Sequence, residues 1–334
     1  MGKFNIKFIK KSVLFFIFFN LTVLSGCGSP FRQEPFSRTG FYFDTVITVT
    51  VYDHGNEELL EQCMELAARY ENLLSPYIEG SDIWKINHSN GSFVTVEKDT
   101  LSLLKTALSY AELSGGLVDP SIGSLSRLWN FGSDNQKLVP GKEQIDKALD
   151  QVDYRTLEIR ENQVTVTSPG VQIDLGFIAK GFIGDRMKEF LSSKGVASAL
   201  INLGGNVVIL GSRPDGSPFR IGIQKPFAPA GSCALTLDLS DISAVSSGNY
   251  ERYFEKDGIL YHHILSTKTG YPVESGLAQV TILSPSSADG DALSTLCYIL
   301  GYEKAARLLK NYPDIQAVFI TEDGHIHYEN FPSA

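Results

Sequence analysis

Two short stretches of the chain combine residue types that could bind a phosphate and a metal ion. In the first, a strand over 171–175 is predicted to pass at Gly176 into a helix that starts near Ile178, because the apolar spacing changes there. The first turn of a helix has free N–H groups and a partial positive charge, so this turn and Lys180 could hold a phosphate. Asp174 could hold a ligand hydroxyl or orient the loop. Taken alone, the stretch fits a glycine turn with a solvated lysine equally well.

The second stretch is Ser287–Thr295, in which Asp291 and Thr295 are four residues apart. If a helix over 291–300 begins near Asp291, the carboxylate and the hydroxyl lie one turn apart on the same face. Both are hard oxygen ligands of the kind that suits Mg²⁺, which completes its shell with water and substrate phosphate. For this stretch alone, a helix N-cap followed by a core threonine is the simpler interpretation.

The elements that must position these residues are interleaved strands and helices, and several strands are joined by short turns. This pattern predicts an α+β fold with mixed or largely antiparallel sheets flanked by helices, in a single large domain over 40–334. In the strand predicted over 259–265, only one of the adjacent His262 and His263 can point into a given pocket. The predicted helices cover 57–74, 100–114, 142–149, 291–300 and 303–311. The other predicted strands cover 41–52, 157–167 in two pieces, 197–203 continued through Gly204 and Gly205 to 210, 219–224, 233–239, 242–248, 277–283, 315–321 and 325–328.

The N-terminal segment has the features of a secretion signal. Four lysines precede an apolar run over 13–19, and Leu24–Cys27 has the small residues and the cysteine of a lipobox. We therefore expect residues 1–26 to be a lipoprotein signal peptide, Cys27 to be lipidated, and 27–39 to be a tether on the extracytoplasmic face of a bacterial cell membrane. An ordinary signal peptide or a single membrane anchor is the alternative, although the apolar run is short for a spanning helix.

The charge balance excludes some partners. The whole chain has a formal charge of −9, and without the four lysines of the signal segment the remainder carries −13. An acidic body is unsuited to nucleic acid and to anionic lipid headgroups. The lipid on Cys27, rather than a basic patch, would therefore hold the protein at the membrane.

Nine short motifs follow one another along almost the whole chain after the tether. They are Phe43–Thr45, Glu71–Ser75 with Tyr77, Ser81–Asn87, Gly116–Pro120, Asp174–Gly181, Ile201–Asn206, Ser246–Arg252, His263–Pro272 and Ala288–Thr295. Each motif is weak by itself, but their number and order are highly specific. In this order they resemble the ApbE family, the FAD:protein FMN transferases.

The resemblance implies a bound FAD whose pyrophosphate is held by Mg²⁺. The FMN half is then transferred to a threonine or serine hydroxyl of an acceptor flavoprotein that carries a flavinylation motif, and AMP is released. The implied metal ligands are the backbone carbonyl of Phe177, the carboxylate of Asp291 and the hydroxyl of Thr295, and His263 is the implied base that activates the acceptor hydroxyl. The implied FAD contacts are Phe43, Tyr77, Val118, Asp119, Pro120, Asp174, Lys180, Leu265 and Ser294.

Two other functions fit the same motifs. One is an FAD pyrophosphatase, in which water replaces the hydroxyl and the products are FMN and AMP. The other is a lipoprotein that binds FAD without chemistry. Retention of Asp291, Thr295 and Lys180 together counts against pure binding, because a carrier needs no metal at the scissile bond.

Overall fold

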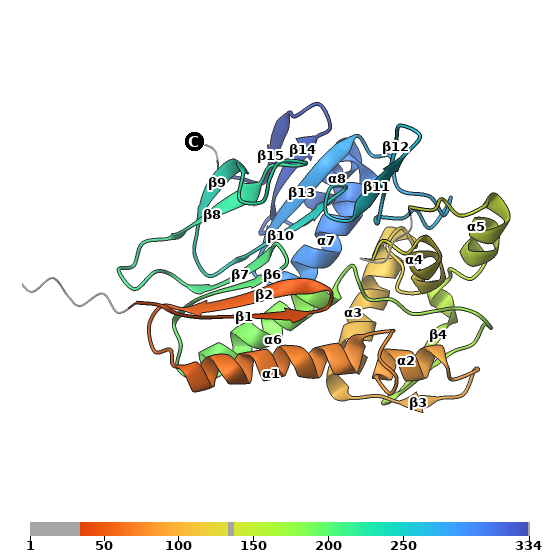
Figure 1. Ribbon diagram of the computed structural model, residues 1–334, viewed down its shortest axis with the longest axis horizontal. Helices are drawn as coiled ribbons and strands as arrows, with labels where there is room; N and C mark the ends of the chain where they lie inside the picture. The colour runs from red at the N-terminus through yellow and green to blue at the C-terminus, as the bar shows by residue number, and fades with distance from the viewer. Residues whose placement is uncertain (1–33, 133–136, 333–334) are drawn as a thin grey trace, which may run out of the picture. The chain divides into compact units, whose positions relative to one another are not determined.

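The central element of the computed structural model is an eight-stranded sheet in which all neighbouring strands are antiparallel (Figure 1). The structure describes residues 34–132 and 137–332. The strands, in their order across the sheet, are β1 (Phe36–Tyr42), β2 (Thr45–Val51), β6 (Ser198–Leu203), β7 (Asn206–Gly211), β10 (Ser243–Gly248), β13 (Leu277–Ser284), β14 (Gln316–Thr321) and β15 (Ile326–Glu329). The predicted α+β fold with largely antiparallel strands is confirmed.

Helices cover one face of this sheet. Alternate residues of the central strands point to that face, and in β2 these are Ile47, Val49 and Val51, each at most 1% exposed. They pack in one large apolar core with the helices. The helices of this layer are α1 (Glu57–Leu74), α3 (Lys98–Ser114), α6 (Ala179–Ser193), α7 (Ser287–Leu300) and α8 (Tyr302–Leu309).

Smaller elements complete the unit. A hairpin of β8 and β9 covers the opposite face of the sheet, where Phe219 and Ile221 pack with Ile209 (Figure 1). A second small core surrounds Trp129 and Leu265. The remaining elements are α2 (Asp82–Asn87), β3 (Val94–Thr95), α4 (Gly123–Trp129), α5 (Lys142–Leu149), the 3₁₀ turn Tyr154–Thr156, β4 (Leu157–Arg160), β5 (Gln163–Val166), β8 (Phe219–Gln224), β9 (Cys233–Leu239), β11 (Tyr253–Lys256) and β12 (Ile259–His262).

The strand predicted over 41–52 is wrong as a single element, because β1 and β2 form a hairpin that turns at Phe43 and Asp44. Both turn residues have positive φ, 54° and 55°. This is the conformation of a type I′ turn, which usually selects Asn or Gly. Because neither Asn nor Gly is present, no residue type in the sequence marks the turn. The alternating pattern of apolar residues therefore continues through it.

The tether predicted over 27–39 is too long at its C-terminal end. Residues 36–39 belong to β1 and pair with Thr48–Val51 of β2. The signal segment 1–26, Cys27 and the tether up to residue 33 lie outside the described residues. Within the described ranges, no helix has the length and apolar character needed to cross a membrane.

The strand predicted over 171–175 is also wrong, because only Gln172 makes a bridge there. The side chain of Asn87 takes the place of a neighbouring strand. It accepts a hydrogen bond from the N–H of Ile173 at 2.6 Å and donates one to the Ile173 carbonyl at 3.0 Å. This segment is therefore an extended connection into α6, held by a side chain from α2.

Gly204 and Gly205 reverse the chain instead of continuing the strand, so that β6 and β7 pair with each other. Both have positive φ, and a Cβ on Gly204 would collide with the hydroxyl of Thr45. The strand predicted over 259–265 is shorter than expected, since β12 ends at His262.

Candidate active site

The N-terminal ends of α6 and α7 meet at Gly181 and Ser287. A Cβ on Gly181 would collide with the carbonyl group of Ser287, so only glycine lets the two backbones approach this closely. The approach places the N–H of Gly181 2.9 Å from Oδ2 of Asp291, which is 110 residues further along the chain. The two stretches that carry the phosphate and metal motifs therefore lie together.

Gly181→Ala is expected to force α6 and α7 apart and to lower the free energy of unfolding by about 1–3 kcal/mol. Chemical denaturation measures this loss. Gly141→Ala is a matched control, because Gly141 has a φ of −67° and a Cβ there would contact only Gln144, at 3.4 Å. Equal stability of the two variants would show that the helices can separate without cost.

Asp291 is the most enclosed acidic side chain of this site, with 3% of its surface exposed. Its Oδ2 accepts from Gly181, and its Oδ1 accepts from Nδ2 of Asn206 at 3.1 Å. Burial raises the pKa of the Asp291 carboxyl, and the positive charge of Lys180 opposes this rise. Asp291 therefore contacts the residue that follows Lys180 and lies within reach of its charge.

The helix that carries Asp291 begins earlier than predicted, at Ser287 rather than near residue 291. Ser286, whose hydroxyl accepts from the N–H of Asp289, caps this start, and Asp185 of α6 binds the first turn as well. Its carboxylate accepts hydrogen bonds from the N–H groups of Ser287 at 2.8 Å and Ala288 at 2.9 Å, two groups that have no partner within the helix. Asp291 consequently lies in the second turn, and the interpretation of Asp291 as an N-cap is wrong.

Hydroxyl groups surround the next turn of α7. Ser247 of β10 lies 2.7 Å from the hydroxyl of Ser294 and 3.2 Å from that of Thr295. Ser294 is fully buried and also donates to the carbonyl of Asp291 at 3.0 Å. Ser294 therefore positions the helix in this structure, whereas Thr295 is only partly buried.

The three predicted metal ligands suit a hard cation. Phe177 lies in the turn immediately before α6, four residues before the N–H that donates to Asp291. In the part of the chain that the structure describes, no group of three or more His, Cys, Asp or Glu side chains could hold a metal ion. The predicted set contains one carboxylate, one hydroxyl and one carbonyl, which is the kind of sparse oxygen set that Mg²⁺ accepts. A buried carboxylate with a raised pKa is also a group that a cation would stabilise.

The adjacent histidines have different environments, although the strand ends at His262 and does not include His263. His262 is 4% exposed and sits in the core, where its Nδ1 accepts from the N–H of Ile264 and its Nε2 donates to the carbonyl of Val273 at 3.1 Å. His263 faces the charged residues instead. Burial, followed by the charges of Arg252, His262 and Lys180, lowers the pKa of His263 to about 3. Its Nδ1 is buried and has no hydrogen-bond partner among the described residues.

His262 makes the folded state sensitive to acid. Burial lowers its pKa from 6.5 to about 4, so the unfolded chain binds a proton in the intervening pH range while the folded chain does not. The stabilisation is complete above pH 6.5 and is lost as the pH falls towards 4, by about 2–3 kcal/mol. We expect His262→Gln, which offers a donor and an acceptor but does not titrate, to lose this part of the pH dependence in urea unfolding at pH 7.5 and 4.5. An identical pH dependence in both proteins would contradict the assignment.

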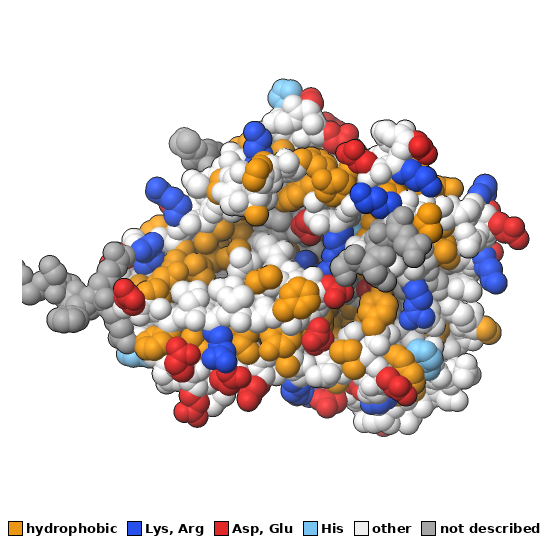
Figure 2. Space-filling view, in the orientation of Figure 1, with side chains coloured by type: hydrophobic (Ala, Val, Ile, Leu, Met, Phe, Trp, Pro, Cys, Tyr) orange, Lys and Arg blue, Asp and Glu red, His pale blue; other side chains and the backbone are white. Residues whose placement is uncertain are grey.

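Glu251 and Arg252 also belong to the site, although the sequence-based set omitted them. Both lie in the turn between β10 and β11, and the carbonyl of Arg252 accepts from the N–H of His263 at 3.1 Å. The Glu251 side chain reaches solvent, but the surrounding protein raises its pKa, against the effect of Lys180. Figure 2 shows a hollow on this face in which acidic and basic side chains meet. The sequence could have indicated Glu251 and Arg252, because these two residues end the Ser246–Arg252 motif.

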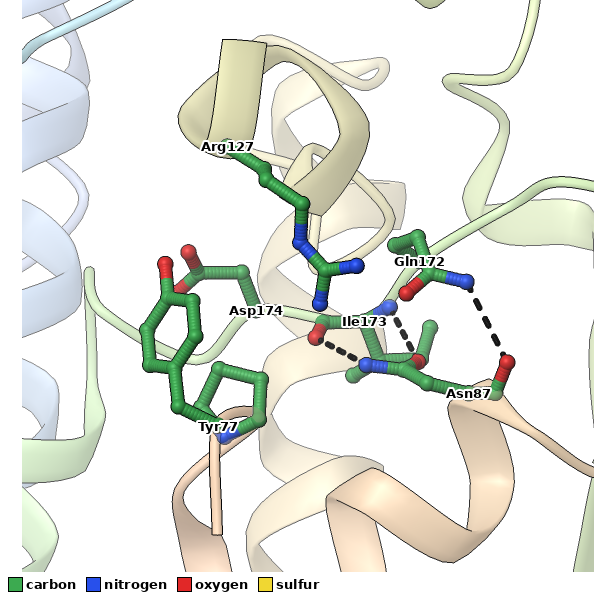
Figure 3. A pocket seen from close by; sticks show the side chains of 8 residues that line it. Tyr77, Asn87, Arg127, Gln172, Ile173 and Asp174 are labelled. Atoms are coloured by element: carbon green, nitrogen blue, oxygen red, sulfur yellow. Dashed lines mark hydrogen bonds between the residues drawn. The ribbon is translucent and has the colours of Figure 1, made fainter. Parts of the chain in front are cut away.

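A small pocket of about 10 Å³ lies beside the segment that leads into α6 (Figure 3). Tyr77 and Asp174, two predicted FAD contacts, lie next to each other at its edge, and Tyr77 is 64% exposed. The guanidinium of Arg127, on the unpredicted helix α4, lies 6.0 Å from the centre of the Tyr77 ring. Burial raises the pKa of the Tyr77 hydroxyl, the charge of Asp174 adds to this rise, and the charges of Arg127 and Arg252 oppose it. The lining of the pocket is Pro76, Tyr77, Asn87, Gly123, Arg127, Gln172, Ile173 and Asp174.

The other predicted FAD contacts divide by exposure. Phe43 and Lys180 are partly exposed, whereas Val118, Pro120 and Leu265 are buried. The carboxylate of Asp119 makes three hydrogen bonds inside the protein, since it accepts from the N–H and hydroxyl of Ser121 and from the N–H of Tyr154. This turn fixes the chain that supports the site, because the carbonyl of Pro120 accepts from the N–H of Asp174 at 2.8 Å.

Comparison with known proteins agrees with this arrangement. The model of the ApbE family matches residues 43–319. The chain belongs to the ApbE family. Relatives of this ApbE protein include an FAD:protein FMN transferase of Treponema pallidum, 35% identical over 91% of this chain and 89% of its own length. Another, of Klebsiella pneumoniae, is 37% identical over 87% of this chain and 90% of its own length.

Solved structures show the same fold. The ApbE protein of Thermotoga maritima superposes with a TM-score of 0.81 at 32% identity, covering 89% of this chain and 97% of that one. The flavinyl transferase ApbE of Pseudomonas stutzeri, in its apo form, has a TM-score of 0.76 at 28% identity, with 89% and 93% covered. The relatives are transferases, and this ApbE protein is an enzyme of that class.

Proposed function

We propose that this ApbE protein is a Mg²⁺-dependent FAD:protein FMN transferase that joins FMN through a phosphoester to a threonine or serine of an acceptor flavoprotein and releases AMP. The observation that supports this most directly is the contact of Gly181 with Asp291. Through this contact a buried carboxylate lies at the start of α6, at the residue that follows Lys180 in sequence, and the positive charge of Lys180 acts on His263. The names of the relatives supply the substrate and the acceptor class.

In the proposed reaction, the acceptor oxygen attacks the phosphorus on the riboflavin side of the FAD diphosphate. A new P–O bond forms, the bridging P–O bond breaks, and AMP leaves with the bonding electron pair. The proton of the hydroxyl passes to His263, which burial and neighbouring cations keep neutral in the free enzyme but also make a weak base. The negative charge of the bound diphosphate would raise the basicity of His263 by offsetting Arg252 and Lys180.

The charge that develops on the phosphate oxygens needs compensation. Mg²⁺, held by Asp291, Thr295 and the carbonyl of Phe177, would supply most of it when bound. The positive charge of Lys180 and the partial positive charge at the start of α6 would add to it. Asp185 and Ser247 keep α7 in the register that presents Asp291 and Thr295.

We also propose that the enzyme acts at the extracytoplasmic face of the bacterial cell membrane, anchored by lipid on Cys27. The support is the signal segment over 1–26 and its lipobox. Mass spectrometry of the membrane-extracted protein tests this, since the mature chain should begin at a diacylated Cys27.

One incubation tests the function. The purified full chain is mixed with FAD, Mg²⁺ and a peptide that carries the family's flavinylation motif, and the peptide mass and AMP are followed. A peptide heavier by FMN is the expected result. AMP without a peptide adduct would identify an FAD pyrophosphatase, and FAD binding without AMP would identify a carrier.

A further inference from the structure

Three aromatic side chains form an exposed surface beside the active site. We call Phe227, Tyr250 and Tyr253 the aromatic surface. The ring of Phe227 packs edge-on against both tyrosines, with centroids 6.0 Å from Tyr250 and 5.5 Å from Tyr253. Phe227 is nevertheless 51% exposed and Tyr253 is 44% exposed. Exposed, rigid aromatic rings of this kind are enriched where proteins bind other polypeptides.

The loop between β8 and β9 is built to present Phe227. Its backbone has a φ of +57°, an unfavourable conformation for a bulky residue that costs about 1–3 kcal/mol. The side-chain amide of Gln224 holds the loop in this shape through four hydrogen bonds to the loop backbone. It donates to the carbonyls of Lys225, Ala228 and Pro229 at 3.0–3.2 Å and accepts from the N–H of Gly231 at 3.0 Å. These hydrogen bonds hold Phe227 in a strained backbone conformation in which its apolar ring is exposed. This combination indicates a binding role.

The aromatic surface is continuous with the catalytic residues. Tyr250 and Tyr253 flank Glu251 and Arg252 in one turn, and the carbonyl of Arg252 accepts from the N–H of His263. Tyr250 is fixed by a hydrogen bond from its hydroxyl to Oε1 of Gln279 at 3.0 Å. In Figure 2, apolar side chains lie at the edge of the hollow in which charged side chains meet. A chain bound on this surface would thus enter the site from the side of the proposed base.

We propose that the aromatic surface binds the polypeptide segment that flanks the acceptor hydroxyl. This proposal rests on the proposed transferase function. The expected FAD contacts all lie outside residues 224–253, so FAD does not account for the exposed rings. The second substrate is a polypeptide, whose apolar side chains and backbone can pack on Phe227 and Tyr253 while its hydroxyl reaches His263.

The test compares a six-residue peptide limited to the flavinylation motif with a twenty-residue peptide that contains it. The full-length enzyme and its Phe227→Gly and Tyr253→Ala variants are assayed for the KM of each peptide and the Kd of FAD. Phe227→Gly also removes the strained φ, so it is expected to fold. Tyr328→Ala is the control, because Tyr328 is likewise 51% exposed but lies on the edge strand β15.

We expect the wild-type enzyme and the control to have a lower KM for the longer peptide. Each surface variant should raise that KM about tenfold and remove most of the preference for length, with the Kd of FAD unchanged within about twofold. A retained preference would overturn the proposal, and a Kd of FAD raised equally would assign the surface to the flavin. If the wild-type enzyme adds FMN to neither peptide, the transferase function fails and this proposal fails with it.

Discussion

Asp291→Asn should stop AMP release, by about a thousandfold or more, while leaving the protein folded. The substitution removes the negative charge that a cation needs but keeps the shape of the side chain. Asn206 can adapt to it, because its Oδ1 has no hydrogen-bond partner among the described residues, and a rotated amide would accept from the new donor. The variant also no longer carries the cost of a buried charge, so its stability without metal should equal or exceed that of the wild type.

Thermal unfolding separates loss of metal binding from loss of structure. Mg²⁺ should raise the Tm of the wild-type protein, since a ligand that binds only the folded state stabilises it, and should leave that of Asp291→Asn unchanged. Asp238→Ala removes an exposed carboxylate on β9 and should behave as the wild type. AMP release at the normal rate by Asp291→Asn would remove Asp291 from the metal site.

His263→Ala should lower FMN transfer by about a hundred- to ten-thousandfold and leave FAD binding within about threefold. The histidine is proposed to take the proton of the acceptor hydroxyl and contributes little to holding the dinucleotide. Single-turnover measurement of the peptide adduct, with the Kd of FAD determined separately, distinguishes the two effects. His54→Ala, in an exposed turn, is the matched control.

The pH profile gives a second test of His263. An ordinary histidine base would produce an acid limb near pH 6.5 in kcat/KM. Because burial and the charges of Arg252 and Lys180 lower its pKa to about 3, His263 stays neutral in the free enzyme, and kcat/KM should show no decline attributable to this group between pH 7 and 5. Unchanged transfer by His263→Ala would place the base elsewhere.

Sequence patterns predicted elements well where local signals and burial agree. The bounds of α1 and of β8 and β9 match the predicted ranges to the residue. α1 is preceded by Asn56, whose side chain caps it, and it ends just before Ser75-Pro76. The alternating pattern of apolar residues predicted a strand incorrectly where the residues are buried for another reason. In 171–175, every second residue is buried, yet the partners of this segment are the side chain of Asn87 and the turn over 120–123, and not a strand.

The meeting of two distant motifs was predictable, because their order along the chain resembles that of the ApbE family. The structure brings Gly181, which follows Lys180, into contact with Asp291. Exposure could not be predicted, because it depends on what the fold packs against each residue. Asp119 and Ser294 are therefore saturated inside the protein, while Glu251, Arg252 and Arg127 line the site without having been chosen.

The close approach of Gly181 and Ser287 also limits when during synthesis the protein can first work. The residues that complete the site follow Ser286, near the end of the chain, and the sheet that supports α6 and α7 pairs strands far apart in sequence. A ribosome-bound or truncated chain that stops before α7 lacks Asp291 and the N–H groups of Ser287 and Ala288 that donate to Asp185. Such a fragment lacks the buried carboxylate of the candidate site, so we expect it to be inactive.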